Sequence, residues 1–384
     1  MDFSTSPEDE EFRARLREFI AAHDPGAPPH GFRERLTWTR AFAATLADEG
    51  WAAPSWPKEV GGMELPLAQQ VIWHEEMALA RMPDHPCTIL NVVGATLIKH
   101  GADDQRSRFL RPLLRADEIW GQGFSEPEAG SDLPALRTRA VLDGDHYVVD
   151  GQKVWTTQGA IADWLFVLTR TGSQDERERG ITCLLVPAAA DGVVIRPLRD
   201  MAGDAGFAQC FFTGVQVPVS QRVGAEGDGW RVARTSLGHE RSTSYVARSI
   251  RYRRIVSELQ AVARTRGLTD DPRIRQRLAD AEIRARLLSL NGMRTFSHLS
   301  KHGEPGPGSS TARLFHTLFE QRLHELAVDV LGMAGQLDRR DPYAIERGRW
   351  TWGFLRTRGS TIGAGTAEIQ RNTIAEQILG LPRG

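Results

Sequence analysis

The spacing of apolar residues changes twice along the chain, and this change restricts the possible folds more than any other feature of the sequence. The first and last parts carry apolar residues at helical intervals, whereas the middle carries short runs of β-branched and aromatic residues between turn signals. The order helices, strands, helices predicts an α+β fold that is mostly α. We expect domain boundaries that separate residues 1–118, 119–223 and 224–384.

The helical spacing is clearest near the two ends of the chain. Phe12, Leu16 and Phe19, followed by Ile20, lie on one face of an amphipathic helix. A wider apolar stripe, typical of a core helix in a bundle, includes Leu314, Phe315, Leu318, Phe319, Leu323, Leu326 and Val330. Both ends of the chain are therefore expected to be helical.

The middle part carries hairpin and strand signals. The pairs Asp143-Gly144 and Asp150-Gly151 interrupt alternating stretches, as turns between strands do. Short apolar runs follow at Trp164–Leu168, Ile181–Val186 and Cys210–Val217. We expect a small β domain here.

Composition excludes several classes of protein. With 384 residues, 41% of them hydrophobic and 25% charged, the chain is long enough for two or three packed domains and is not typical of disorder. The net charge of −1 is spread evenly, so no nucleic-acid partner is expected. Cys87, Cys183 and Cys210 are far apart, which predicts neither a disulfide framework nor a metal site. No signal pattern or long apolar stretch occurs, so we expect a cytoplasmic protein without a membrane partner.

Two segments contain residues that suit a flat polar ligand. The first, 121–132 (GQGFSEPEAGSD), combines glycines that allow close backbone approach with serine hydroxyls. In the second, 148–157 (VVDGQKVWTT), Trp155 and Thr157 share a face if the segment is a strand. Taken singly, the first is more often a turn and the second more often a core tryptophan beside a surface threonine.

Together these segments resemble the flavin-binding signature of the acyl-CoA dehydrogenase family. Two further stretches carry the resemblance, 56–62 (WPKEVGG) and 363–370 (GAGTAEIQ), so it extends over essentially the whole chain. The resemblance implies an N-terminal helical domain, a middle β-barrel-like domain and a C-terminal four-helix bundle. It also implies an FAD-dependent oxidoreductase, a flavoprotein of fatty acid or lipid metabolism that desaturates an acyl-CoA between its α and β carbons.

The resemblance also assigns residues to the cofactor and the substrate. Residues matching flavin contacts are Phe124, Ser125, Gly130, Ser131, Trp155, Thr157, Gly365, Thr366 and Glu368. Ser131 also matches a position near the thioester chain, and Arg241 is expected to contact CoA or to orient the base.

The position of the catalytic base differs from that in many family members. They carry a glutamate directly before the C-terminal Gly-Thr, where this chain has Ala364. Glu240 follows Trp230, Ala233 and Leu237 at helical spacing, which places a carboxylate on an apolar stripe. This arrangement resembles the isovaleryl-CoA dehydrogenase branch and predicts Glu240 as the base that removes the α-proton. The alternative is that Glu240 pairs with a helix charge such as Arg241.

By the same resemblance, the Ala364 backbone N–H is expected to hold the thioester carbonyl oxygen.

The expected partners are an acyl-CoA substrate, an electron-transferring flavoprotein and further copies of the chain in a homotetramer or a dimer. Three alternatives stay open: an acyl-CoA oxidase, a flavin monooxygenase, and a non-catalytic subunit of a mixed tetramer. The last is kept open because residues 250–266 lack the family's Arg-x-x-Phe-Gly segment. No GxGxxG motif supports an NAD enzyme.

Overall fold

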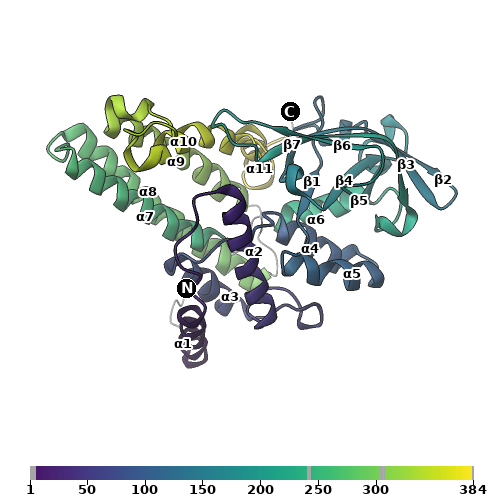
Figure 1. Ribbon diagram of the computed structural model, residues 1–384, viewed down its shortest axis with the longest axis horizontal. Helices are drawn as coiled ribbons and strands as arrows, with labels where there is room; N and C mark the ends of the chain where they lie inside the picture. The colour runs from purple at the N-terminus through teal and green to yellow at the C-terminus, as the bar shows by residue number, and fades with distance from the viewer. Residues whose placement is uncertain (1–5, 240–243, 303–305, 307, 383–384) are drawn as a thin grey trace. The chain divides into compact units, whose positions relative to one another are not determined.

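A computed structural model describes residues 6–239, 244–302, 306 and 308–382. The chain divides into two compact units (Figure 1). The unit that we name the sheet unit comprises Glu18–Pro66 and Met82–Glu240. The other, which we name the helical unit, comprises Met1–Arg17, Leu67–Arg81 and Arg241–Gly384.

The sheet unit contains one sheet of eight strands. Its strands are β1 (Trp120–Gly123), β2 (Arg139–Asp143), β3 (His146–Thr157), β4 (Trp164–Arg170), β5 (Ile181–Pro187), β6 (Val193–Leu198), β7 (Phe207–Pro218) and β8 (Arg222–Val223). Seven follow the order β6-β7-β3-β1-β4-β5-β8, and β2 pairs with β3 and β4. The three predicted apolar runs correspond to β4, β5 and β7.

Helices of the same unit accompany the sheet. They are α2 (Phe32–Asp48), α4 (Leu90–His100), α5 (Asp103–Leu114) and α6 (Gly229–His239). Helix α6 packs against β4 and β5, and every residue from Leu165 to Arg170 on β4 is buried. A strand covered on both faces is apolar without alternation, which explains the continuous run in the sequence.

The two predicted turn pairs have different structures. Gly144 has φ +62° between β2 and β3, as a hairpin turn requires. Asp150-Gly151 lies inside β3, where the pairing with β7 shifts register between Val149 and Gly151. A Cβ at Gly151 would lie 2.7 Å from the Thr138 Cα, so the bulge needs a glycine there. The expectation of a turn at this second pair is therefore wrong.

The helical unit is built around three long helices. Its helices are α3 (Leu67–Leu79), α7 (Ser244–Thr265), α8 (Pro272–His302), α9 (Gly308–Leu331), α10 (Arg349–Arg356) and α11 (Ala367–Gln377), together with most of α1 (Pro7–Ala22). Helices α7 and α8 run side by side (Figure 1). The predicted stripe on α9 supplies buried Phe319, Leu323, Leu326 and Val330 to the core. No described helix combines the length and the apolar character needed to cross a membrane.

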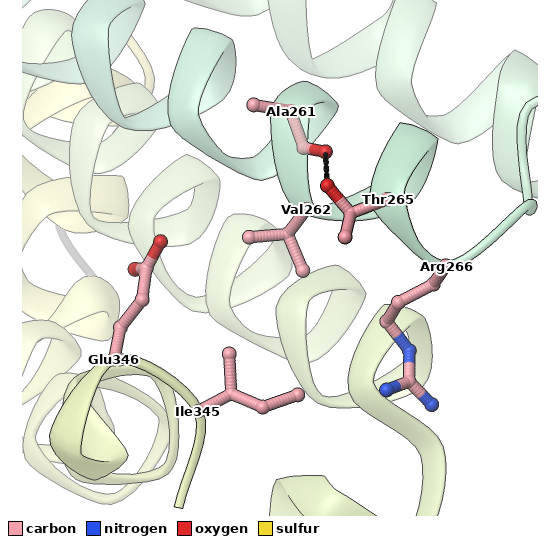
Figure 2. Close-up of a pocket in the computed structure, with 6 residues that line it drawn as sticks. All are labelled: Ala261, Val262, Thr265, Arg266, Ile345 and Glu346. Atoms are coloured by element: carbon pink, nitrogen blue, oxygen red, sulfur yellow. Dashed lines mark hydrogen bonds between the residues drawn. The ribbon is translucent and has the colours of Figure 1, made fainter.

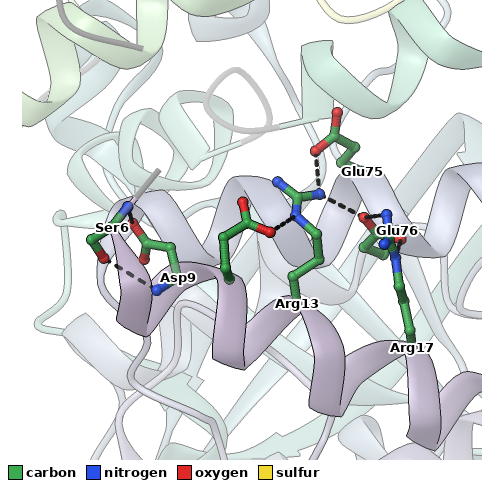
Figure 3. Close-up of polar contacts among 7 residues, drawn as sticks. Ser6, Asp9, Arg13, Arg17, Glu75 and Glu76 are labelled. Atoms are coloured by element: carbon green, nitrogen blue, oxygen red, sulfur yellow. Dashed lines mark hydrogen bonds and ion pairs between the residues drawn. The ribbon is translucent and has the colours of Figure 1, made fainter. Parts of the chain in front are cut away.

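A cluster of charged side chains joins α1 to α3 in the helical unit. Figure 3 shows Arg13 and Arg17 of α1 reaching the carboxylates of Glu75 and Glu76 on α3. Glu76 is almost fully buried and accepts hydrogen bonds from Arg13 at 2.5 Å and from Arg17 at 2.8 Å. Burial opposes ionisation of Glu76, but the bonds from the two arginines outweigh it and lower its pKa.

Glu76 is expected to make the stability of the protein depend on acid pH. Because its pKa is lower in the folded state, its contribution is complete above the unfolded value of about 4.3 and is lost as pH falls through the folded value. The free energy of unfolding, measured by denaturation from pH 6 to pH 3, should decline less steeply in Glu76→Gln. That variant should be less stable by about 1–3 kcal/mol at pH 7. Glu128→Gln, at an exposed ion pair with Arg137, is the control, and equal slopes in Glu76→Gln and wild type would contradict the assignment.

Candidate active site

The predicted site residues fall into two sets. Residues of the segments 121–132 and 148–157 belong to the sheet unit, and the stretch 363–370 belongs to the helical unit. The base Glu240 and its neighbour Arg241 lie outside the described residues. Helix α6 ends at His239, and of the predicted stripe Ala233 is fully buried and Trp230 is half-buried. The placement of Glu240 on that stripe stays a prediction.

The first set is brought together where β1 and β3 meet. Gln122 at the end of β1 pairs with Thr157 of β3. The Val154 N–H donates to the Ser125 carbonyl at 2.9 Å. Phe124 is buried and Ser125 is half-buried. The two segments singled out in the sequence are therefore neighbours in one sheet.

Trp155 is exposed because β3 contains an extra residue at this point. The pairing with β7 shifts register between Lys153 and Thr156, and Trp155 has a left-handed backbone with φ +57°. In a regular strand Trp155 would share the face of Lys153, which is fully buried. Instead Trp155 is 53% exposed, and its ring centroid lies 5.8 Å from that of Phe207 with the two rings nearly perpendicular. A non-glycine residue held in this conformation, with a large aromatic surface open, suits the binding of a flat ring.

A buried ion pair supports the backbone beneath this set. Lys153 donates to Glu126 at 2.7 Å and to the Phe124 carbonyl at 3.1 Å. Glu126 also accepts from the backbone N–H groups of Arg137 and Thr138. Burial lowers the pKa of Lys153 to about 8, although Glu126 opposes that shift. Neither residue was predicted individually from the sequence; the signal available was a lysine on the same alternating face of the strand as Tyr147 and Val149, which are fully buried.

Gly130 and Ser131 lie in the exposed turn that follows Glu126. A Cβ at Gly130 would meet no atom within 4 Å, so no neighbour in the fold requires a glycine there. The space beside this turn is open to a ligand.

The second set forms the entry to α11. Ala364 has φ +50° and Gly365 has φ +89°. Thr366 is the N-cap, and its hydroxyl accepts from the Ile369 N–H at 3.2 Å. Glu368 is exposed and pairs with Arg371. Because the first backbone N–H groups of a helix have no acceptor within it, this entry suits a carbonyl oxygen or an anion.

One hollow in the helical unit contains none of the predicted residues. Figure 2 shows this pocket of about 650 Å³, which is lined by Ala261, Val262, Thr265, Arg266, Ile345 and Glu346. The Thr265 hydroxyl donates to the Ala261 carbonyl, and Arg266 donates to the Val330 carbonyl. Within the described part of the chain, no three His, Cys, Asp or Glu side chains are grouped so that they could hold a metal ion.

Comparisons with known proteins identify the family. Family models match in chain order: the acyl-CoA dehydrogenase N-terminal domain at residues 6–117, its middle domain at 121–216 and its C-terminal domain at 227–379. These matches span most of the chain, and the chain belongs to the acyl-CoA dehydrogenase family. It has the fold of that family, with an N-terminal helical, a middle sheet and a C-terminal helical domain, and is an oxidoreductase of this flavoprotein family.

Individual relatives agree with this identification. The chain is 38% identical over 391 residues to the acyl-CoA dehydrogenase IpdE1 of Mycobacterium tuberculosis, covering 97% of this chain and 98% of the relative. The solved structure named "Tcur3481-Tcur3483 steroid ACAD" is similar with a TM-score of 0.86 and 29% identity, and each chain is covered completely. The ChsE4-ChsE5 complex from Mycobacterium tuberculosis is similar with a TM-score of 0.81 and 34% identity, again over the whole of both chains.

Proposed function

We propose that the chain catalyses the FAD-dependent α,β-dehydrogenation of an acyl-CoA thioester. The observation that carries this proposal is the exposed indole of Trp155, held on a strand bulge beside Ser125 in a chain of the acyl-CoA dehydrogenase family. FAD, when bound, supplies the acceptor for a hydride from the substrate's β-carbon. Trp155 would lie against its ring system, Ser125 and Thr157 would bond its edge, and Thr366 would contact it from the C-terminal loop.

Two groups of this chain would act on the substrate itself. Glu240 would take the α-proton, and the Ala364 N–H would donate to the thioester carbonyl oxygen, on which negative charge develops as the proton leaves. A carboxylate on the apolar face of a helix is a stronger base than one in water, because burial raises its pKa. Ser131 and Arg241 would contact the CoA portion.

We further propose a bulky, polycyclic acyl group as the substrate class. This rests on the similarity to a structure named a steroid ACAD and on the prediction that Glu240 is the base. Members of the family that carry the base on this helix rather than in the C-terminal loop act on branched, long or bulky acyl chains.

Anaerobic titration of the purified yellow protein tests this proposal. A CoA thioester of a steroid side-chain acid should bleach the visible absorption of the flavin much faster than butyryl-CoA or octanoyl-CoA does. Equal bleaching by the straight-chain thioesters would contradict the substrate class. Absence of bleaching by every acyl-CoA would contradict dehydrogenation, and rapid reoxidation by oxygen with peroxide release would instead favour an oxidase.

A mixed assembly is the second candidate, because one similar structure is a complex of two differently named chains. In that arrangement, this chain would bind its flavin together with a second acyl-CoA dehydrogenase chain rather than with copies of itself. Purification of the chain alone and with a co-expressed relative would distinguish a mixed assembly from a homo-oligomer. Flavin retained by the chain alone, in a stable homotetramer or dimer that an electron-transferring flavoprotein reoxidises, would support the homo-oligomer.

A further inference from the structure

One peptide group carries both the Gly363 carbonyl and the Ala364 N–H, and helix α9 binds that carbonyl. The Arg313 guanidinium of α9 donates through Nη2 to the Gly363 carbonyl oxygen at 2.5 Å. The peptide is trans, and because a trans peptide is planar, its C=O and N–H point in opposite directions. The bond to Arg313 therefore also fixes the direction in which the Ala364 N–H points.

The Ala364 N–H is available to a ligand. Among the described residues it has no hydrogen-bond acceptor. Groups on either side of it are occupied. The Gly363 N–H donates to the Gly359 carbonyl at 3.1 Å. The Gly365 carbonyl accepts from the Gln370 side chain at 3.3 Å. The fold thus leaves this donor open while it binds the groups beside it.

The peptide is held in an orientation that the local sequence disfavours. Ala364 has φ +50°, which residues other than glycine rarely adopt. Rotation of the peptide by half a turn would return φ of Ala364 to negative values and would point its N–H to the opposite side. Gly363 has no side chain to hinder that rotation, and Ile362 beside it is 66% exposed, so apolar packing hinders it little. A strained conformation of this kind persists only where its surroundings determine it.

The bond from Arg313 is suited to hold this orientation. A guanidinium is always charged in proteins, and a charge-assisted hydrogen bond is about twice as strong as one between neutral groups. Rotation of the peptide would break this bond and would bring an N–H in place of the carbonyl oxygen toward the cation. The charge also draws electron density through the peptide toward its oxygen, which makes the Ala364 N–H a stronger donor.

The segment before this peptide has its own attachment to α9. Gln321 donates to the Thr357 carbonyl at 3.1 Å and to the Thr361 hydroxyl at 3.0 Å. Loss of the Arg313 side chain should therefore release the peptide between residues 363 and 364 without detaching the residues that precede it.

We propose that Arg313 is a positioning residue for the Ala364 N–H, and that it acts by holding the Gly363–Ala364 peptide against rotation. This inference rests on the proposed function, in which that N–H binds the thioester carbonyl oxygen. Because negative charge develops on this oxygen as the α-proton leaves, loss of the donor slows the reaction more than it weakens binding of the substrate.

Rapid anaerobic flavin reduction by the CoA thioester of a steroid side-chain acid, followed over a range of concentrations, tests the effect on the reaction. Arg313→Met should lower the limiting rate about 10-fold, equivalent to about 1.4 kcal/mol, while the apparent dissociation constant changes less than about twofold. Arg313→Lys retains a charged donor and should keep more of the rate than Arg313→Met. Arg322→Met, the same change at an exposed arginine of α9, should behave as wild type. A wild-type limiting rate in Arg313→Met, or a loss confined to the dissociation constant, would overturn the proposal.

Crystal structures of the flavin-loaded variants test the positioning without any turnover. In Arg313→Met we expect the peptide between residues 363 and 364 to be rotated, fully or in a second conformer, with Ala364 at negative φ. Arg322→Met should keep the positive φ of wild type. A single, wild-type orientation of the peptide in Arg313→Met would overturn the positioning role. A rotated peptide in a protein that no acyl-CoA bleaches would support the role of Arg313 and contradict only the proposed reaction.

Discussion

Replacing Glu240 by glutamine is expected to slow flavin bleaching by acyl-CoA by about 10²–10⁴-fold, the usual contribution of a general base. Glutamine keeps the size of the side chain but cannot accept the α-proton. The flavin contacts assigned to Trp155 and Thr157 lie on other elements, so the variant should keep its yellow colour and bind acyl-CoA with an affinity near that of wild type.

Glu240→Asp provides the matched comparison, because it keeps the carboxylate and withdraws it by one methylene. We expect Glu240→Asp to be bleached more slowly than wild type and faster than Glu240→Gln. A flavin-loaded Glu240→Gln protein that bleaches at the wild-type rate would exclude Glu240 as the base. It would also favour the alternative that this carboxylate only pairs with a helix charge.

Replacing Lys153 by methionine is expected to lower the free energy of unfolding by about 3–5 kcal/mol, as the removal of one partner from a buried ion pair does. Lys153 is fully buried and Glu126 is 8% exposed, so the variant leaves a carboxylate inside the protein with only backbone donors. The Phe124 carbonyl also loses its bond to Lys153, and flavin should dissociate more readily.

Chemical denaturation and flavin release measure both effects. Lys153→Met/Glu126→Gln should recover part of the lost stability, because it removes the uncompensated charge. Arg137→Gln, which removes an exposed pair with Glu128, should cost less than about 1 kcal/mol. If Lys153→Met also lowered the free energy of unfolding by less than about 1 kcal/mol, the Lys153–Glu126 pair would not support the backbone at Phe124.

Much of the fold could be predicted from spacing alone, since a helix or strand with one buried face repeats its apolar residues at a defined interval. Phe12, Leu16 and Phe19 are buried on α1 as expected, and the apolar runs became β4, β5 and β7. The exception at Gly151 has a physical cause. The register shift lies in the pairing of β3 with β7, and a Cβ at Gly151 would meet Thr138, so both constraints come from residues outside the local Asp-Gly pattern.

The candidate site was predictable only in part. The segments around Ser125 and Trp155 were identified, and β1 and β3 bring them together. The exposure of Trp155 was not predictable, because alternation places it with Lys153 and only the register shift against β7 separates them. Likewise, the contacts of Arg313 and Gln321 with the segment before Ala364 depend on how α9 packs, which short-range patterns do not reveal.

The mass of the CoA thioester after one anaerobic turnover tests α,β-dehydrogenation by this chain. The proposed dehydrogenation predicts a product that has lost two hydrogen atoms, formed in a one-to-one ratio with reduced flavin. A thioester of unchanged mass in the presence of bleached flavin, or a product that forms only with oxygen and contains an added oxygen atom, would contradict α,β-dehydrogenation by this chain.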